Sequence, residues 1–532
     1  VDRRQRQMCI RDSIYSVKET YSAEIKIIFN LPSIHKSGLR VFCLEVGMIK
    51  YFIIIIFCFS ITKSQPLYEN IFYPLDNGGN FGYFVIITDT LMFISAHQDN
   101  INGNSSGSLY YYSYNDSNWS FKERILPDDG QPNDFFGVPH LSKKYLYVGA
   151  FGNRGSVYVY KYEDNEWTET QKLVPDTLIY LSAFGISIQE CNDDLFVGAS
   201  SDSRFVEASG AVYVYKKSND GIWERSQKIY PDIMKEYAHF GYKIETNSKY
   251  NHLFISAPED SNDAGLFAGN VYILNKSDSL WEVKQILTPD LGEAFPYFGS
   301  SIKSKEDYLF IGAPGSGSTQ SGGSVYVYKI NNSRWEYLKK IISPINVIRD
   351  YFGYSIFIEG DSILIGAPGD VYNGNRTARA YLYIQNNDDF NLSYTFESSD
   401  SIYYDGFGIG VSMNKYEYLI GAPYGRKAYL YSPYPMSIND EGGLLTDYFL
   451  FQNYPNPFNP VTKIKFSIPK SDIVKIRVYD VLGKEIQTLL NEYKTTGSYE
   501  VEFDARNLPS GVYFYRMICG SYIETKKMIL LR

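Results

Sequence analysis

The sequence predicts an all-β protein, in which a seven-bladed β-propeller is followed by a small immunoglobulin-like β-sandwich. Three observations support this fold class. A Phe-Gly pair recurs every 48 to 58 residues, each of the first six pairs begins a set of four short strand-like runs, and the repeat region has no stretch with helical periodicity. A fixed period of this size indicates a repeat architecture. The seven pairs begin at Phe81, Phe136, Phe184, Phe240, Phe298, Phe352 and Phe407.

Each repeat contains four strand-like runs separated by turn-forming residues. In the third repeat these runs are 184–189, 194–200, 210–217 and 222–232. Four short runs rich in β-branched and aromatic residues indicate an antiparallel meander. The third run is apolar on both faces, as expected if each sheet packs between two others, like the blade of a propeller. The fourth run is more polar and usually ends in proline, which predicts that it lies at the outer edge.

The seventh repeat stops at its third run, which ends at Tyr431. Residues 67–74, with the sequence LYENIFYP, resemble the fourth runs of the other repeats and lead directly into Phe81. We therefore expect this N-terminal strand to complete the last blade of a propeller that spans 65–432. Such closure leaves no blade with an open face.

The repeat pattern resembles the FG-GAP repeat family over roughly residues 67–432. The family is named after a Phe-Gly (FG) segment and a Gly-Ala-Pro (GAP) segment. Both are found in the sixth repeat, in Phe352 to Ile356, FGYSI, and in Leu364 to Pro368, LIGAP. The family's best-known members, the integrin α-subunit propellers, hold calcium in an Asp-rich loop before the Gly-Ala-Pro strand. Here that loop is a tight turn at 359–362, so the resemblance does not imply the calcium site. The chain looks closer to calcium-poor bacterial members.

The first 47 residues differ from the rest of the chain and begin with Val. The opening VDRRQRQMCIRDS resembles the translation of a sequencing adapter. We therefore expect residues 1–47 to be an upstream segment that is not native, and a disordered native extension is the alternative.

A signal peptide is predicted at 48–64. Met48 begins a segment with a lysine near its start and an apolar run at 51–61, followed by small residues. This order is typical of secretory signal peptides, and the run is shorter than the roughly 20 residues that span a bilayer. Cleavage is expected between Ser64 and Gln65, and no later segment is predicted to be transmembrane.

Charge and cysteine content restrict the class of partner. Without residues 1–64, 41 basic residues face 55 acidic ones, a net charge of −14. Mild acidity favours solubility and argues against nucleic acid or an anionic membrane as a partner. The remaining cysteines, Cys191 and Cys519, lie in separate predicted domains, so neither a disulfide framework nor a cysteine metal site is expected.

The sequence contains no recognisable set of catalytic residues. It has no nucleophile elbow, no phosphate loop and no His/Cys cluster. One loop, 260–265, comes near a calcium motif, but Ala264 replaces the ligand at its fifth position. We expect no catalytic residue and no cofactor, with Asp260, Asn262 and Asp263 as weak candidates for calcium.

Loop lengths predict which face binds a ligand. In a four-stranded meander, the loops between second and third strands share one face with the connections between repeats. These 2–3 loops vary widely in length, as at 258–269, 314–323 and 368–379. Variable loops on a rigid scaffold usually carry recognition, so we predict that this face binds a protein or a glycan.

A linker at 433–448 precedes a second predicted domain, residues 449–532. Its strand-like runs lie at 463–468, 474–480, 499–503, 511–517 and 526–531. Their spacing suits a small immunoglobulin-like sandwich.

Short motifs follow one another along the second domain, and their residues include Tyr454, Pro455, Asn456, Pro457, Phe458, Tyr479, Asp480, Gly483, Ser510, Gly511, Tyr513, Lys526, Lys527 and Arg532. Through these motifs the domain closely resembles the type A C-terminal sorting domain of type IX secretion in Bacteroidota and their relatives. This resemblance implies export through the periplasm, passage through the outer membrane with the type IX machinery as partner, and then removal of the domain with anchoring or release.

These observations together predict an extracellular or surface-attached binding or adhesion protein that is not an enzyme. Two alternatives stay open, because a fold does not fix function. One is a secreted propeller hydrolase or lyase that acts on an extracellular polymer. The other is a structural component of the surface layer.

Overall fold

The protein is all-β in the part of the chain that the structure describes, which confirms the predicted fold class. A single 3-10 turn, η1 (Pro423–Gly425), accompanies the strands. Among these residues no helix is long and apolar enough to cross a membrane. The predicted signal peptide and its upstream segment lie outside the described residues. The computed structural model describes residues 67–531 apart from 77, 116–117, 176–180, 290–295, 316–321, 346–348, 370–377, 400–404, 433–447, 451–452, 454–455, 469, 496 and 521.

Seven four-stranded antiparallel sheets are found between Tyr68 and Ser432 among the described residues. Six of them are meanders of four consecutive strands. From the innermost strand outward, the first sheet is β2 (Val85–Ile87), β3 (Leu91–Ala96), β4 (Ser108–Asn115) and β5 (Asn118–Ile125), and the second is β6 (Phe136–Leu141), β7 (Tyr145–Ala150), β8 (Ser156–Glu163) and β9 (Glu166–Leu173). The third sheet is β10 (Phe184–Cys191), β11 (Asp194–Ala199), β12 (Ala211–Lys217) and β13 (Trp223–Ile229), and the fourth is β14 (Ile244–Asn247), β15 (His252–Ala257), β16 (Asn270–Ser277) and β17 (Leu280–Leu287). The fifth sheet is β18 (Ser301–Lys305), β19 (Tyr308–Ala313), β20 (Ser324–Asn331) and β21 (Arg334–Ile342), and the sixth is β22 (Ser355–Glu359), β23 (Ser362–Ala367), β24 (Arg379–Asn386) and β25 (Asp389–Phe396).

The seventh sheet combines both ends of the repeat region. Its strands are β26 (Val411–Met413), β27 (Tyr418–Ala422), β28 (Lys427–Ser432) and, outermost, β1 (Tyr68–Phe72). In the antiparallel register, Tyr68 stands opposite Ser432 and Phe72 opposite Ala428. The N-terminal strand thus fills the position that the sequence leaves empty in the seventh repeat.

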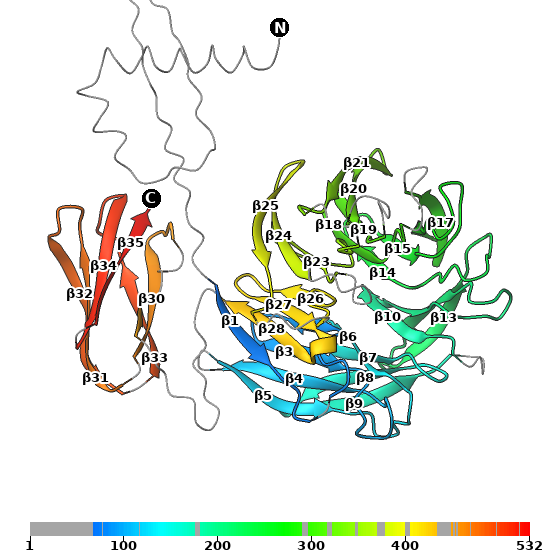
Figure 1. The fold of residues 1–532 in the computed structure, drawn as a ribbon, viewed down its shortest axis with the longest axis horizontal. Helices are drawn as coiled ribbons and strands as arrows, with labels where there is room; N and C mark the ends of the chain where they lie inside the picture. The colour runs from blue at the N-terminus through cyan, green and yellow to red at the C-terminus, as the bar shows by residue number, and fades with distance from the viewer. Residues whose placement is uncertain are drawn as a thin grey trace, which may run out of the picture. The chain divides into compact units, whose positions relative to one another are not determined.

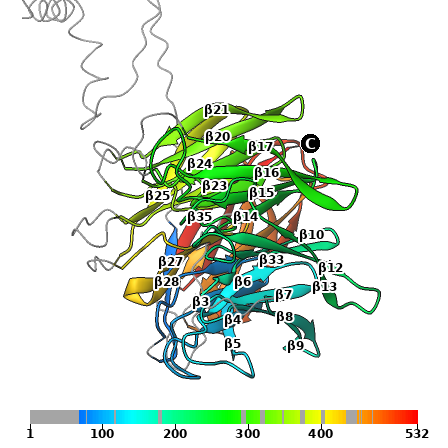
Figure 2. The same ribbon diagram turned by 90° about the vertical axis from the view of Figure 1, so that its right-hand side faces the viewer.

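The sheets form a closed, propeller-like ring. Their innermost strands contact one another in the order β2, β6, β10, β14, β18, β22 and β26, and β26 contacts β2 again. Figure 1 shows the sheets arranged around a common centre, and Figure 2 shows the ring after a 90° turn. The innermost strands therefore surround an axial space, and the outermost strands form the rim.

The Phe-Gly pairs hold neighbouring sheets together. All seven phenylalanines are buried, and each belongs to an apolar cluster drawn from two adjacent sheets. Each ring lies edge-on or tilted against a tyrosine of the third strand in its own sheet, with centroids 5.0 to 5.6 Å apart. The glycine that follows has φ between +91° and +140° in every repeat, a region that strains other residues.

A second set of contacts joins the sheets at the rim. The side chain of Gln227 in β13 donates to the backbone carbonyl of Trp281 in β17 and accepts from its N–H, both at 2.9 Å. The same pair of bonds joins Gln171 to Trp223 and Gln285 to Trp335. The backbone of these three tryptophans, which lie at the start of fourth strands, is thus hydrogen-bonded to the neighbouring sheet.

The C-terminal part of the chain forms two packed sheets. One has three strands in the order β29 (Phe449–Leu450), β30 (Val461–Ile468) and β33 (Gly497–Asp504). The other has four in the order β32 (Glu485–Lys494), β31 (Asp472–Tyr479), β34 (Gly511–Cys519) and β35 (Tyr522–Leu530). Both sheets contribute side chains to one apolar core.

The sequence does not reveal β32, because this strand lies at a sheet edge and is mostly exposed. The apolar pattern that marks a buried strand is therefore weak in it.

Candidate functional site

Two of the three calcium candidates, Asp260 and Asn262, are already engaged in hydrogen bonds, and the third, Asp263, is exposed. Asp260 is 1% exposed, and its carboxylate accepts from Asn270 Nδ2 at 2.7 Å and Tyr272 Oη at 2.9 Å and pairs with Lys235 Nζ at 2.8 Å. Asn262 Oδ1 accepts the backbone N–H of Ala264 at 2.8 Å. Calcium would have to displace these bonds, and no group of three or more His, Cys, Asp or Glu arranged to hold a metal occurs among the described residues.

The histidines divide into structural and cavity-lining ones. His252 Nδ1 accepts from the indole of Trp335 at 3.0 Å, which ties two sheets together. His97 and His140, in contrast, line a cavity on the propeller axis. The repeat positions of these histidines are not equivalent, so the repeat pattern gives no sign that two of them share a cavity.

The axial cavity has a volume of about 820 Å³ and is lined from the inner strands of all seven sheets. At one end it reaches the exposed residues Asp89, Glu359 and Lys415, in the turns between first and second strands. At the other end, beneath the 2–3 loops, it is bounded by aromatic side chains. A cavity of this size matches those that bind small molecules.

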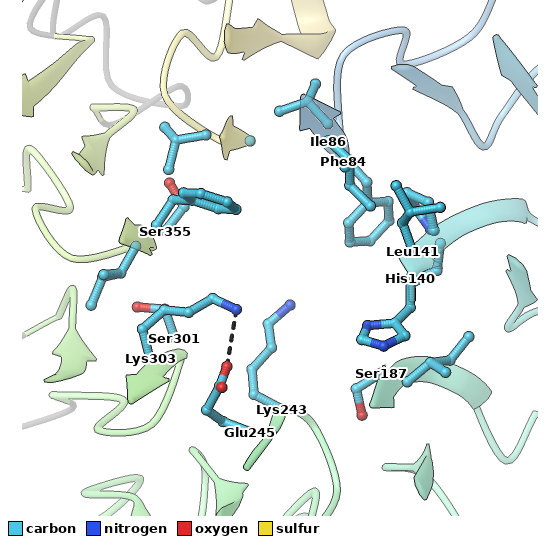
Figure 3. Close-up of a pocket in the computed structure, with 18 of the residues that line it drawn as sticks. Phe84, Ile86, His140, Leu141, Ser187, Lys243, Glu245, Ser301, Lys303 and Ser355 are labelled. Carbon is cyan, nitrogen blue, oxygen red and sulfur yellow. Dashed lines mark hydrogen bonds and ion pairs between the residues drawn. The ribbon is translucent and has the colours of Figure 1, made fainter. Parts of the chain in front are cut away.

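Charged side chains meet in the middle of this cavity (Figure 3). Lys303 Nζ pairs with Glu245 Oε2 at 2.9 Å. Lys243 extends into the same space, and among the described residues it has no carboxylate partner. Burial, helped by repulsion from Lys303, lowers the pKa of Lys243 to about 8, so the amine is still mostly protonated at neutral pH.

His140 faces the charged centre from the opposite wall (Figure 3). Its Nε2 accepts the backbone N–H of Glu190 at 3.1 Å. Burial, with a smaller effect from Lys303, lowers the pKa of His140 to about 4, so the imidazole is neutral at physiological pH. The proton of a neutral ring that accepts through Nε2 is on Nδ1.

The aromatic end of the cavity lies beneath the loop-bearing face. The hydroxyls of Tyr83 and Tyr354 are 3.3 Å apart, and burial raises the pKa of Tyr354. The ring of His97 lies 4.6 Å from Tyr83, and its buried Nδ1 has no hydrogen-bond partner. Burial lowers the pKa of His97 to about 4. These side chains narrow the cavity at this end.

The loop-bearing face also displays apolar side chains to solvent. Ile233, Phe205 and Leu266 are 72%, 63% and 65% exposed. Phe205 and Leu266 stand in 2–3 loops and Ile233 in the connection between their two sheets. Of the predicted binding loops, 258–269 is described, whereas much of 314–323 and 368–379 lies outside the described residues.

The Asn-Pro-Phe segment of the C-terminal motif lies along the last strand, β35. Asn456 Oδ1 accepts the N–H of Ile529 at 2.8 Å. The N–H of Phe458 donates to the carbonyl of Ile529 at 2.9 Å, and the N–H of Leu531 donates to the carbonyl of Phe458 at 3.0 Å. The ring of Phe458 is buried in the core. The segment thus fixes the end of β35.

Two further motifs form tight turns. Asp480 Oδ1 accepts the N–H groups of Leu482 and Lys484, both at 2.9 Å, and Gly483 has a φ of +79°. Tyr513 donates its hydroxyl to the carbonyl of Pro509 at 2.8 Å.

The remaining motif residues have more exposed or simpler positions. Tyr479 lies under the guanidinium of Arg516, 5.3 Å from the ring centre, and Lys526 pairs with Glu524 at 2.9 Å. Ser510 and Gly511 stand at the exposed start of β34, and Lys527 lies in β35. The predicted site residues outside the described part of the chain are Ser64, Gln65, Tyr454, Pro455 and Arg532.

Comparison with solved structures finds chains that are similar at low sequence identity. PorZ, described as an essential bacterial surface component of the type-IX secretion system of Porphyromonas gingivalis, is similar with a TM-score of 0.42 and 12% identity, over 85% of this chain and 60% of PorZ. The periplasmic gluconolactonase PpgL of Pseudomonas aeruginosa is similar with a TM-score of 0.42 and 10% identity, over 74% of this chain and 94% of PpgL. This chain thus spans about 60% of the length of PorZ. No curated protein matches the chain.

Two protein families match parts of the sequence. Residues 281–328 and 335–383 match the FG-GAP repeat, and residues 452–531 match the secretion system C-terminal sorting domain. The chain therefore carries FG-GAP repeats in a propeller-like fold, followed by a C-terminal sorting domain of type IX secretion.

Proposed function

We propose that this protein is delivered to the cell surface or the extracellular space and binds a partner protein there through the loop-bearing face of its propeller. The sorting domain at 452–531 supports delivery by type IX secretion. After delivery, the domain is removed and the propeller is anchored to the outer membrane or released.

The exposed apolar side chains on the loops are the observation that carries the binding role. Ile233, Phe205 and Leu266 project from successive loops and connections of two neighbouring sheets. Large apolar side chains that are strongly exposed on the loops of one face favour an interaction site there, because their contact with water is unfavourable. Aliphatic side chains such as Ile233 and Leu266 favour a protein partner over a glycan, which aromatic faces recognise better.

A matched pair of variants tests this proposal. Phe205→Ser/Ile233→Ser/Leu266→Ser alters the loop-bearing face. Ile222→Ser/Leu280→Ser alters the opposite face, where these two side chains are similarly exposed beside the turns between third and fourth strands. The readout is saturable binding by the purified chain without residues 1–64 to a panel of purified surface and extracellular-matrix proteins and to a glycan array.

The proposal requires that the triple variant loses binding to a protein of the panel and that the double variant keeps it. Binding that survives the triple substitution would contradict it, as would binding to glycans alone. Turnover of a panel member by the purified chain would favour the enzyme alternative.

A further inference from the structure

Lys243 is a cation on the wall of the axial cavity, directly before the innermost strand β14. It follows Gly241 by two positions on the inner side of its sheet, where the equivalent residues of other repeats include Phe84, Ser301 and Ser355. Its ammonium lies 5.2 Å from the ring centre of Tyr242 and 5.8 Å from that of Phe84. The surroundings of this charge are thus largely aromatic.

The charges around Lys243 do not compensate it. Glu245 is the acidic side chain drawn beside it, and its carboxylate is already paired with Lys303 at 2.9 Å (Figure 3). Lys303 therefore places a second ammonium near Lys243, and the two repel each other. A half-buried positive charge without a carboxylate partner is unfavourable, and an anion entering the cavity would offset that cost.

His140 adds a hydrogen-bond donor to the same space. Because its Nε2 accepts from Glu190, the ring presents a protonated Nδ1, which has no hydrogen-bond partner among the described residues. Figure 3 shows the His140 ring and the Lys243 side chain directed into the cavity from different walls. The cavity thus offers one ammonium and one neutral N–H to a guest, and no free carboxylate is drawn beside them.

The cavity walls around Lys243 and His140 are apolar, and the cavity has room for a small molecule. Phe84, Ile86 and Leu141 line the side near His140, as Figure 3 shows. Phe357, two residues after Ser355 on β22, also lines the cavity. We propose that the axial cavity binds a small organic anion, whose carboxylate or phosphate group is held by Lys243 and His140 and whose apolar body packs against these side chains.

The anion enters from the face opposite the variable loops. At that end the cavity opens beside the exposed residues Asp89, Glu359 and Lys415. At the loop end the hydroxyls of Tyr83 and Tyr354 approach to 3.3 Å across it. The anion site and the protein-binding face are therefore separate, and an experiment can refute one of the two proposals without refuting the other.

Isothermal titration of the purified chain without residues 1–64 tests the anion site with two matched pairs of probes. Benzoate is compared with the uncharged benzamide, and phenyl phosphate with phenol. We expect saturable binding of at least one anion and binding of its uncharged partner that is weaker by about 10-fold or more, since the charge-assisted bond is lost. The better of the two anions identifies the charged group that the site prefers.

Variants then assign the binding to the two donors. Lys243→Met, which keeps the length of the side chain, should weaken anion binding about 10-fold or more, and His140→Phe about 5- to 10-fold. Lys249→Met, on an exposed lysine paired with Asp307, should bind like the wild type. The Phe205/Ile233/Leu266 triple variant should also bind the anion normally.

Three results would overturn the anion site. The first is that neither benzoate nor phenyl phosphate binds. The second is that an anion and its uncharged partner bind with equal affinity. The third is that Lys243→Met and His140→Phe both bind the anion with wild-type affinity. Lys243→Met should also melt at a higher temperature than the wild type without anions, because it removes the uncompensated charge. If this variant does not fold, the titration of His140→Phe decides.

Discussion

The carbonyl oxygen of Gly353 lies 2.0 Å from the position that a Cβ atom on Gly312 would occupy. Gly353 belongs to the Phe-Gly pair of one sheet, and Gly312 to the Gly-Ala segment of the preceding sheet. The same approach joins Gly408 to Gly366 and Gly241 to Gly198. The glycines of the two halves of the repeat motif thus meet each other across the interface between sheets, which explains why the Gly-Ala segment has no side chain at this position.

Gly312→Ala should destabilise the propeller strongly. The added methyl group would meet backbone at 2.0 Å and Ser301 Oγ at 2.2 Å, and a backbone carbonyl cannot move away without separating the sheets. We expect a loss of about 3 kcal/mol in the free energy of unfolding, measured by chemical denaturation. Gly360→Ala is the control, because a Cβ atom at this position has no neighbour within 4 Å. It should lower the free energy of unfolding by only about 1 kcal/mol, since the backbone φ of +54° strains an alanine. Equal losses in the two variants would refute the steric explanation.

Gln227→Ala should loosen the rim between two sheets. It removes both hydrogen bonds to the backbone of Trp281, one donated and one accepted. A loss of about 1 to 3 kcal/mol in unfolding free energy is expected, since partly buried backbone groups lose their partners. Glu224→Gln, at an exposed site on the same strand, should change stability by less than about 0.5 kcal/mol. A neutral effect of Gln227→Ala would mean that water replaces the amide.

Acidification should destabilise the protein through His97. Its pKa is about 4 in the folded state because of burial, whereas the ordinary value is 6.5. Between these values the unfolded chain binds a proton that the folded protein excludes, so stability falls as the pH falls from about 6.5 to 4. The slope from one such group is about 1.4 kcal/mol per pH unit.

His97→Leu should remove this slope while leaving other titrations in place. Asp350, whose pKa is raised to about 7 by burial, acts in the opposite direction in both proteins and cancels in the comparison. Denaturation curves at pH 6 and pH 4.5 should therefore show a smaller loss of stability for the variant. Equal losses of stability in the wild type and the variant would show that His97 takes up its proton in the folded protein as readily as in the unfolded chain.

Removal of residues 449–532 should prevent delivery to the surface. The sorting domain would be absent, so the truncated protein should accumulate in the periplasm, whereas the full chain reaches the surface or the medium. Cell fractionation and protease accessibility of intact cells distinguish the two locations. Normal surface display of the truncated protein would show that the propeller carries its own export information.

Much of the fold follows from local pattern in the sequence. The Phe-Gly spacing predicts the sheets, the two-sided apolar third runs predict their burial between neighbours, and the motif at 67–74 predicts the strand that pairs with β28. Each of these signals is carried by residues close together in the chain or by their regular repetition. The edge strand β32 was missed because exposure leaves it without such a pattern.

The sequence determined the sheets, their order and the sorting domain, because those features depend on residue types at short and regular spacing. The tertiary structure alone decided the axial cavity. Its donors, His140 and Lys243, come from different sheets, and each is unremarkable in its own strand. They share one space because closing the ring brings the inner strands of all the sheets around a common axis, and no local pattern reports which side chains meet there.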